Sequence, residues 1–371
     1  MKKTVFLLCI LLVCVCSLPV YASDTDTLQE LYEESGMAQS AEVLDDTTLT
    51  FLYAVGLDPK DVSAWTDADM IVLWEIFAKQ IKEKWEQPAK LLASLIGMLL
   101  LSLLMQMLSV GTAVVPGDLF VTVVCGGLLG APMIRLLRQI KAVFETANGF
   151  VESFLPAYAG ILAATGQSAA AAGIQTVAFA TASIVTKLMN ELLLPAVSVY
   201  IALCFVSAAG DLIRTDEIAK AVSSAISWSL GIVMSFFTLT LSVQKLIVQS
   251  ADSLGMKTAK LAVSTLIPVV GGQLSDALST VTGCLQILKS SAGSFAVIAL
   301  LLLFLPAVLS VIAILMVVKA GQITAILFHL DAAKRAFAAL GSGVGLLLGI
   351  MLCAAAAMII SVAMLAAAMG G

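Results

Sequence analysis

Few residues in this chain have the types and spacing that enzymatic chemistry requires. His329 is the only histidine, so an HExxH zinc site cannot form and a catalytic triad could use no other imidazole. The run GSGVGLLLG at 341–349 resembles a dinucleotide-binding fingerprint, but it opens an apolar helix with no strand before it, which favours helix packing. The sequence also lacks a GxxxxGK[ST] phosphate-binding loop. We therefore expect no enzymatic activity and no cofactor.

The cysteines do not suggest a metal site either. Of the seven, three belong to the N-terminal apolar run, and the rest are far apart in apolar segments without a CxxC pair. We expect these to be small buried hydrophobic residues. The four are Cys125, Cys204, Cys284 and Cys353.

The composition is that of a membrane protein. The chain is 60% hydrophobic and 12% charged, with a mean hydropathy of +1.04, whereas soluble domains are about 45–50% apolar and about 25% charged. Lys2 and Lys3, a short apolar run and small residues before position 23 predict a signal peptide over 1–22; an uncleaved anchor is the alternative. The net charge of −5 and the lack of a basic–aromatic patch exclude nucleic acid as a partner.

Charge divides the rest of the chain into a leader and a membrane domain. Between Asp24 and Glu86 there are 15 acidic and 4 basic residues, which predicts an acidic, helical, extracytoplasmic region over 23–87. Gly36 and the Asp58-Pro59 pair should stop its short helices, and Pro88 should mark a break before the membrane domain at 88–371.

Apolar stretches of suitable length predict an all-α, multi-span membrane domain. A further segment, 168–186, is rich in small residues and is a seventh candidate. If the leader lies outside, Arg135, Arg138 and Lys141 also lie outside, against the positive-inside tendency. The six predicted spans are 91–110, 118–134, 192–209, 221–243, 294–318 and 343–368.

The membrane domain contains signs of an internal duplication. SFLPAYAG at 153–160 resembles TLIPVVGG at 265–272, and LLLPAVSVYIAL at 192–203 resembles the residues at 302–315. The order and spacing of these matches predict repeat units at about 136–245 and 246–371. Three crossings per unit would make the repeats inverted, and two would make them parallel. Duplicated broken segments are typical of transport pathways.

The stretch KTAKLAVSTLIPVVGGQLSDALSTVTG at 257–283 predicts a helix–break–helix hairpin, with a plain amphipathic surface helix as the alternative. The proline removes a backbone donor, the glycine pair permits a sharp turn, and the aspartate would supply a polar lining. Irregular backbone at membrane depth must be covered by protein or line water. The residues expected to shape a conduit, in both repeats, are Pro156, Gly160, Pro268, Gly271, Gly272 and Asp276. The residues expected at lipid headgroups are Lys257 and Lys260.

The wider segment GMKTAKLAVSTLIPVVGGQLSDALSTVTGCLQILKSSAG at 255–293 resembles the hallmark of the stage III sporulation protein AE family. The order of parts is also similar, although the linker after Val318 is looser than the family pattern. The resemblance implies a protein of the mother-cell membrane around the forespore, within a trans-envelope complex whose membrane channel the family is suspected to form or gate. It implies partners among the other stage III sporulation membrane proteins of the same operon, with a homo-oligomer also open, and no catalytic residues.

Two other functions stay open at this stage. A secondary transporter or exporter of a small solute would use the duplicated breaks as substrate sites, but coupled transporters commonly bury charges within their spans. Here Asp118, Glu191 and Asp276 are expected near span ends or in the hairpin. The third hypothesis is a purely structural scaffold for the complex, with the acidic leader as its docking surface.

Overall fold

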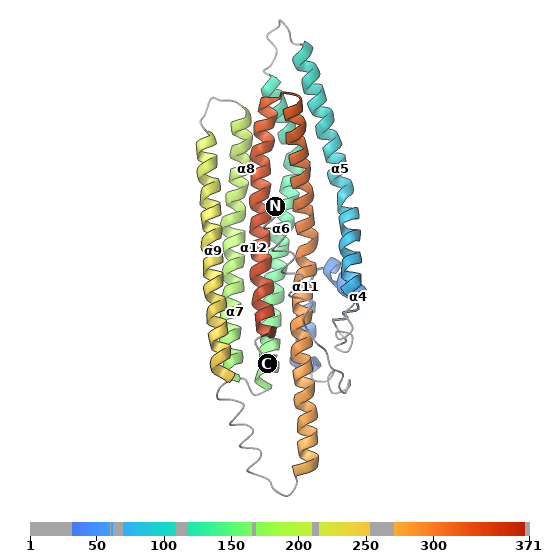
Figure 1. Cartoon of the computed structure of the whole chain (residues 1–371), viewed down its shortest axis with the longest axis vertical. Coiled ribbons are helices and arrows are strands. Elements are labelled where there is room, and N and C mark those ends of the chain that lie inside the picture. Colours follow the sequence, from blue (N-terminus) through green and yellow to red (C-terminus); the bar gives the residue numbers. More distant parts are fainter. Residues whose placement is uncertain are drawn as a thin grey trace.

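Long helices along one axis make up this computed structural model, which describes residues 32–59, 61, 70–108, 117–164, 168–209, 215–252 and 271–367 (Figure 1). No strand occurs in these residues, and five helices are long and apolar enough to cross a membrane. The all-α, multi-span class is therefore confirmed. The longest elements are α5 (Met70–Leu108), α6 (Gly117–Ala164), α9 (Thr215–Asp252), α11 (Gly271–Leu327) and α12 (Asp331–Ala367).

Two segments that were predicted as separate spans form one rod. Here α7 (Ser168–Lys187) continues through a π-helical turn, η2 (Leu188–Leu193), into α8 (Leu194–Ala209). Pro195 lies two positions after the last residue of the turn and has no N–H to donate, which is a common cause of a local change in helix pitch. The prediction of two spans, 168–186 and 192–209, was wrong, and Glu191 lies inside the candidate span Gln175–Val206 and not at its end.

The predicted breaks at prolines are also absent from the described helices. Helix α5 runs through Pro88, and α6 runs through Pro156 and past Gly160. A proline in a helix interior costs about 3 kcal/mol, yet both helices stay continuous through it. The breaks expected at Pro88 and at Pro156 with Gly160 are therefore wrong as local structure.

The described part of the acidic leader folds against the bundle and includes the short helices α3 (Met37–Ala41) and α4 (Asp46–Val55). Gly36 and Gly56 adopt positive φ angles of 73° and 86° at helix ends, where a residue with a Cβ would be strained. Tyr32 is buried, and its hydroxyl donates to the carbonyl oxygen of Pro59. This burial, with Asp58 nearby, raises the pKa of Tyr32 well above its ordinary value, so the hydroxyl stays a neutral donor. The predicted stop at Gly36 is confirmed.

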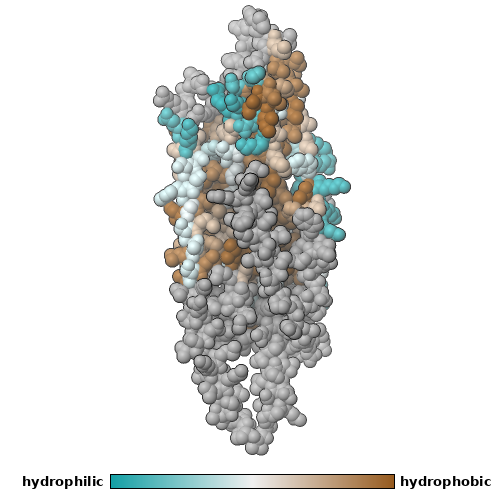
Figure 2. All heavy atoms as spheres, viewed as in Figure 1, coloured by the Kyte–Doolittle hydropathy of each residue, from teal (hydrophilic) through white to brown (hydrophobic). Residues whose placement is uncertain are grey.

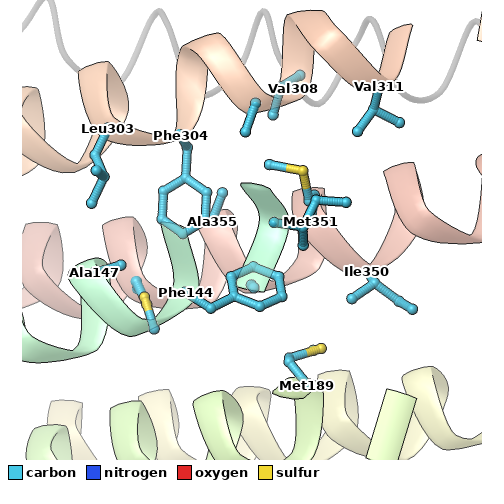
Figure 3. Packing of buried hydrophobic residues seen from close by; sticks show 14 of the residues in the cluster. Phe144, Ala147, Met189, Leu303, Phe304, Val308, Val311, Ile350, Met351 and Ala355 are labelled. Atoms are coloured by element: carbon cyan, nitrogen blue, oxygen red, sulfur yellow. The ribbon is translucent and has the colours of Figure 1, made fainter. Parts of the chain in front are cut away.

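The centre of the bundle is formed by α11 and α12. Figure 3 shows Phe144 of α6 lying among side chains from α11, α12 and η2, including Phe304, Met351 and Met189. The Phe144 and Phe304 rings lie 6.2 Å apart, and both are almost completely buried. Aromatic and aliphatic side chains from four elements therefore fill the core at this level, as close-packed protein interiors require.

Two helical hairpins run in the same direction along the bundle (Figure 1). The first hairpin, residues 168–252, rises through α7–η2–α8 and returns through α9; the second hairpin, residues 271–367, rises through α11 and returns through α12. If the predicted duplication is real, its units are therefore parallel and share this two-helix part. The duplication itself stays a prediction.

Candidate functional site

The residues predicted to shape a conduit lie on two helices where the structure describes them. Pro156 and Gly160 are exposed on α6, near its C-terminal end. Gly271 and Gly272 begin α11. The side chain of Asp276 in α11 lies outside the described part, as do the residues Lys257, Lys260 and Pro268. The role of these residues in a conduit stays a prediction.

The second half of the hairpin predicted at 257–283 is continuous with the membrane span that follows it, and not a separate helix as expected. Helix α11 continues without interruption from Gly271 to Leu327, through both the amphipathic stretch and the predicted span 294–318. At 57 residues it is about 85 Å long, whereas a bilayer with its headgroups is about 40–45 Å thick. A separate re-entrant helix after the glycine pair is therefore not formed.

A polar face on α9 points away from the bundle. Its hydroxyl side chains are exposed, and those of Ser227, Ser235, Thr238 and Ser242 each donate to the carbonyl oxygen of the residue four positions earlier. For Ser227, Ser235 and Thr238 these distances are 2.9 Å. Only 22% of the candidate span Glu217–Val243 is buried within the protein, the lowest share of the five. We call these residues the α9 hydroxyl face: Ser224, Ser227, Gly231, Ser235, Thr238 and Ser242.

Polar groups also meet between α6 and the first hairpin. The Thr186 hydroxyl donates to Asn148 Oδ1 at 3.2 Å, and Asn148 Nδ2 donates to Glu152 Oε1 at 2.8 Å. Beside them, the Oδ1 atom of Asn190 in η2 is buried and accepts no hydrogen bond. Because a buried acceptor without a donor is costly, this seam is a local weak point in an otherwise apolar bundle.

The interior around these groups is filled. A cavity of about 10 Å³ lies among α6, α7 and α12, lined by side chains that include Leu155, Thr181 and Ser361. Such a volume holds about one water molecule. Among the residues that the structure describes, no three histidine, cysteine, aspartate or glutamate residues form a metal-binding group.

A family comparison identifies the chain. The family model described as stage III sporulation protein AE matches residues 61–369, which include the polar face of α9, the seam between α6 and α7 and the central helices. This chain belongs to the stage III sporulation protein AE family. The resemblance noted in the sequence is therefore confirmed, and membership in this family indicates a multi-pass membrane protein of sporulation.

One curated relative in this family is the stage III sporulation protein AE of Bacillus subtilis (strain 168). It is 22% identical over 165 residues, which are 44% of this chain and 41% of the relative. The chain therefore spans about two fifths of the length of the relative it matches. No solved structure matches the chain.

Sequence reasoning missed two of the features described here. The α9 hydroxyl face could have been found, because serine, threonine and glycine recur at intervals of three and four residues along a predicted span. The contact between Thr186 and Asn148 joins residues 38 positions apart, and no local pattern indicates it.

Proposed function

We propose that the chain is the membrane component of a trans-envelope complex between mother cell and forespore, and that it contributes a wall of the membrane conduit in that complex. The proposal contains no catalytic step. The close packing where the described helices α6, α7 and α12 meet, with a cavity of only about 10 Å³ between them, supports a conduit formed between copies, or between this chain and partners from the same operon, and not within one bundle.

The α9 hydroxyl face is the observation that carries this proposal. Lipid tails offer nothing to a row of hydroxyl groups, whereas water or a closely packed protein surface does. Because four of these hydroxyls already donate within α9, their remaining lone pairs can accept hydrogen bonds from passing water or solute. A face of this kind on the least buried candidate span suits the wall of a shared conduit.

Cysteine accessibility in sporulating cells tests the proposal. The native cysteines would first be removed, and a single cysteine would then be introduced at Ser227, Ser235 or Ser242. Each variant would be treated with a small, membrane-impermeant thiol reagent. We expect labelling at all three positions, and slower labelling when a larger reagent blocks the conduit. Cysteines at the buried Val233 and Phe237 of the same helix are matched controls and should stay unlabelled.

A structural scaffold is the second candidate, because the closely packed core would serve it equally well. In that case the α9 hydroxyl face would be covered by a neighbouring protein. All three cysteines would then be protected when the partners are present and become labelled when the partner genes are deleted. That pattern would contradict the conduit and support the scaffold.

A further inference from the structure

Four exposed charged side chains border the seam between α6 and the rod formed by α7, η2 and α8. On α6, the side chains of Lys141 and Glu145 are each 59% exposed. They share a helix stripe with Asn148, which accepts the hydrogen bond from Thr186 of the rod. The two charged residues of the rod are also exposed, and the first of them follows Thr186 directly. We call these four residues the charge quartet: Lys141, Glu145, Lys187 and Glu191.

The charge quartet lies at the depth where the neighbouring helices are apolar. Its two rod members are near the middle of the candidate span Gln175–Val206. On α6, the Phe144 ring lies 6.2 Å from the Phe304 ring of α11, and Phe304 is the middle residue of the charge-free stretch 290–318. Figure 2 shows hydrophilic surface near the upper end, where α9 and α12 begin, and pale or hydrophobic surface along α9 below it. The quartet is therefore level with the hydrocarbon core that these helices cross.

Exposed charges at this depth do not face lipid. An unpaired charge at the centre of a bilayer is costly, and residues of this kind almost always face protein or a water-filled cavity. The leader also lies on α6 near this level, because Val43 packs against Gly149, and the adjacent Glu42 is exposed. The surface that carries the charge quartet therefore faces protein or water.

Large apolar side chains on the same surface favour protein. Ile134 lies on the stripe of α6 that contains Lys141, seven positions before it, and is 51% exposed. On the rod, Ile184 and Leu192 are 45% and 51% exposed on either side of the charged residues. A wall that faces water gains nothing from such side chains, whereas a protein interface combines a buried apolar part with paired polar groups. We therefore expect another protein surface to cover this one.

The order of the charges along the seam fits a second copy of the chain. Heights are counted from the hydrogen bond between the two antiparallel helices toward the upper end in Figure 1, at 1.5 Å per residue. Lys187 and Glu145 lie about 1.5 and 4.5 Å above that bond, and Glu191 and Lys141 lie about 7.5 and 10.5 Å above it. At each of two levels, an acid on one helix thus accompanies a base on the other.

A two-fold axis along the membrane normal would place α6 of one copy opposite the rod of the other, at the same level. Glu145 then faces Lys187 of the partner subunit, and Lys141 faces Glu191 of the partner subunit. Symmetry produces each pair twice. Within the described residues, the two rod members have no ion pair of their own, and the contact between Lys141 and Glu145 is long at 3.7 Å. The quartet is therefore available for pairing between copies.

We propose that this surface is a symmetric interface between two copies of the chain, at which the two charge quartets form four ion pairs. The apolar side chains of Ile134, Ile184 and Leu192 keep water away from these pairs, which strengthens them. The interface uses α6 and the rod and not the α9 hydroxyl face. It therefore does not depend on the proposed conduit and would hold equally for a scaffold.

Charge reversal tests the pairing. The full chain would be placed in liposomes, and its association would be measured by single-molecule photobleaching at decreasing protein density. We expect the wild type to be a dimer. Glu145→Lys and Lys187→Glu should each raise the dissociation constant of the dimer at least about tenfold, because like charges then face one another. The double variant should restore the wild-type value, and melting temperatures would show whether each variant is folded.

A matched variant controls for the change of net charge. Lys334 is 51% exposed beside the turn between α11 and α12, and Lys334→Glu makes the same charge change as Lys187→Glu. It should leave the dissociation constant unchanged. The proposal is wrong if the two single reversals in the quartet also leave it unchanged. It is also wrong if the wild type stays monomeric at every density, even if another protein then binds to this surface.

Cross-linking locates the interface without changing the sign of a charge. After removal of the native cysteines, a tagged copy with Lys141→Cys and a differently tagged copy with Glu191→Cys would be expressed together in a bacterium without other sporulation genes. We expect a short bifunctional maleimide to join the two tags. Trp228→Cys, at a position of α9 that is 72% exposed, replaces Glu191→Cys in the control and should not be joined to position 141. Links between copies at position 228 alone would place the interface on α9 and overturn the proposal.

Discussion

The two hairpins have similar lengths and the same direction, yet opposite places in the bundle. In the first hairpin the two candidate spans are 39% and 22% buried within the protein, and in the second they are 72% and 61% buried. The second hairpin is thus the core of the molecule and the first is an outer layer. The difference teaches that the most apolar candidate spans are also the ones most buried by protein, whereas the exposed surface of the first hairpin combines hydroxyl groups with large apolar side chains such as Trp228 and Leu239.

The prolines of the two hairpins show the same contrast. Pro195 is exposed and is preceded by the π-helical turn η2, while Pro306 is buried in α11, which stays α-helical around it. Neighbours on all sides hold α11 in one geometry, but the outer rod has room to change its pitch. Within the described residues, Lys187 and Glu191 at the start of this outer turn form no ion pair, although they are four positions apart.

The largest expected difference concerns aromatic side chains. Phe304→Ala in the second hairpin should lower the free energy of unfolding by about 3–5 kcal/mol, since it opens a cavity in the core. Phe236→Ala in the first hairpin removes a side chain that is 39% exposed and should cost under about 1 kcal/mol. Equilibrium unfolding in mixed detergent and SDS micelles measures both. Equal losses would contradict the division into core and outer layer.

A smaller difference is expected for glycines. A Cβ at Gly321 in α11 would lie 2.8 Å from the ring of Phe337, whereas a Cβ at Gly231 in α9 would meet nothing within 4 Å. Gly321→Ala should therefore destabilise by about 1–3 kcal/mol, and Gly231→Ala should stabilise by about 0.5–1 kcal/mol. Melting temperatures in detergent measure the two signs, and a stabilising Gly321→Ala would refute the tight contact.

The smallest expected difference between the two hairpins concerns the stability that a single threonine hydrogen bond contributes. Thr186→Val in the first hairpin removes the bond to Asn148 and should cost about 0.6 kcal/mol, the average for such bonds in membrane proteins. Thr324 in the second hairpin bonds to Ala320 of its own helix at 3.0 Å, so Thr324→Val should have almost no effect. A double-mutant cycle of Thr186→Val with Asn148→Ala measures the coupling; zero coupling would show that the contact adds no stability.

The helical class and most spans could be predicted from the sequence, because apolarity and length act locally. Helix continuity could not. Pro88 and Pro156 carry a real local cost, yet α5 and α6 continue through them. Glu191 was expected near the end of a span, but it lies inside the candidate span Gln175–Val206, at an exposed position of the helix.

The candidate site was predictable only in part. Pro156 and Gly160 were found by comparing repeats, but the bend expected from them depends on how α6 packs, which the sequence does not contain. The α9 hydroxyl face has a visible period, yet its outward direction depends on α9 packing against other helices on its opposite side. The sequence showed that Arg135, Arg138 and Lys141 conflict with the positive-inside tendency if the leader lies outside, but it could not show how the helix that contains them packs.

The central position of α11 and α12 has a consequence for biosynthesis. These helices are translated after α5 to α9, so the outer helices enter the membrane before the core that will hold them exists. Until residue 271 emerges, the faces of α6 and α7 that will contact α12 have to be shielded by lipid, by each other or by the insertion machinery. A ribosome that stalls after the first hairpin therefore leaves an outer layer without a centre, which quality-control proteases should remove.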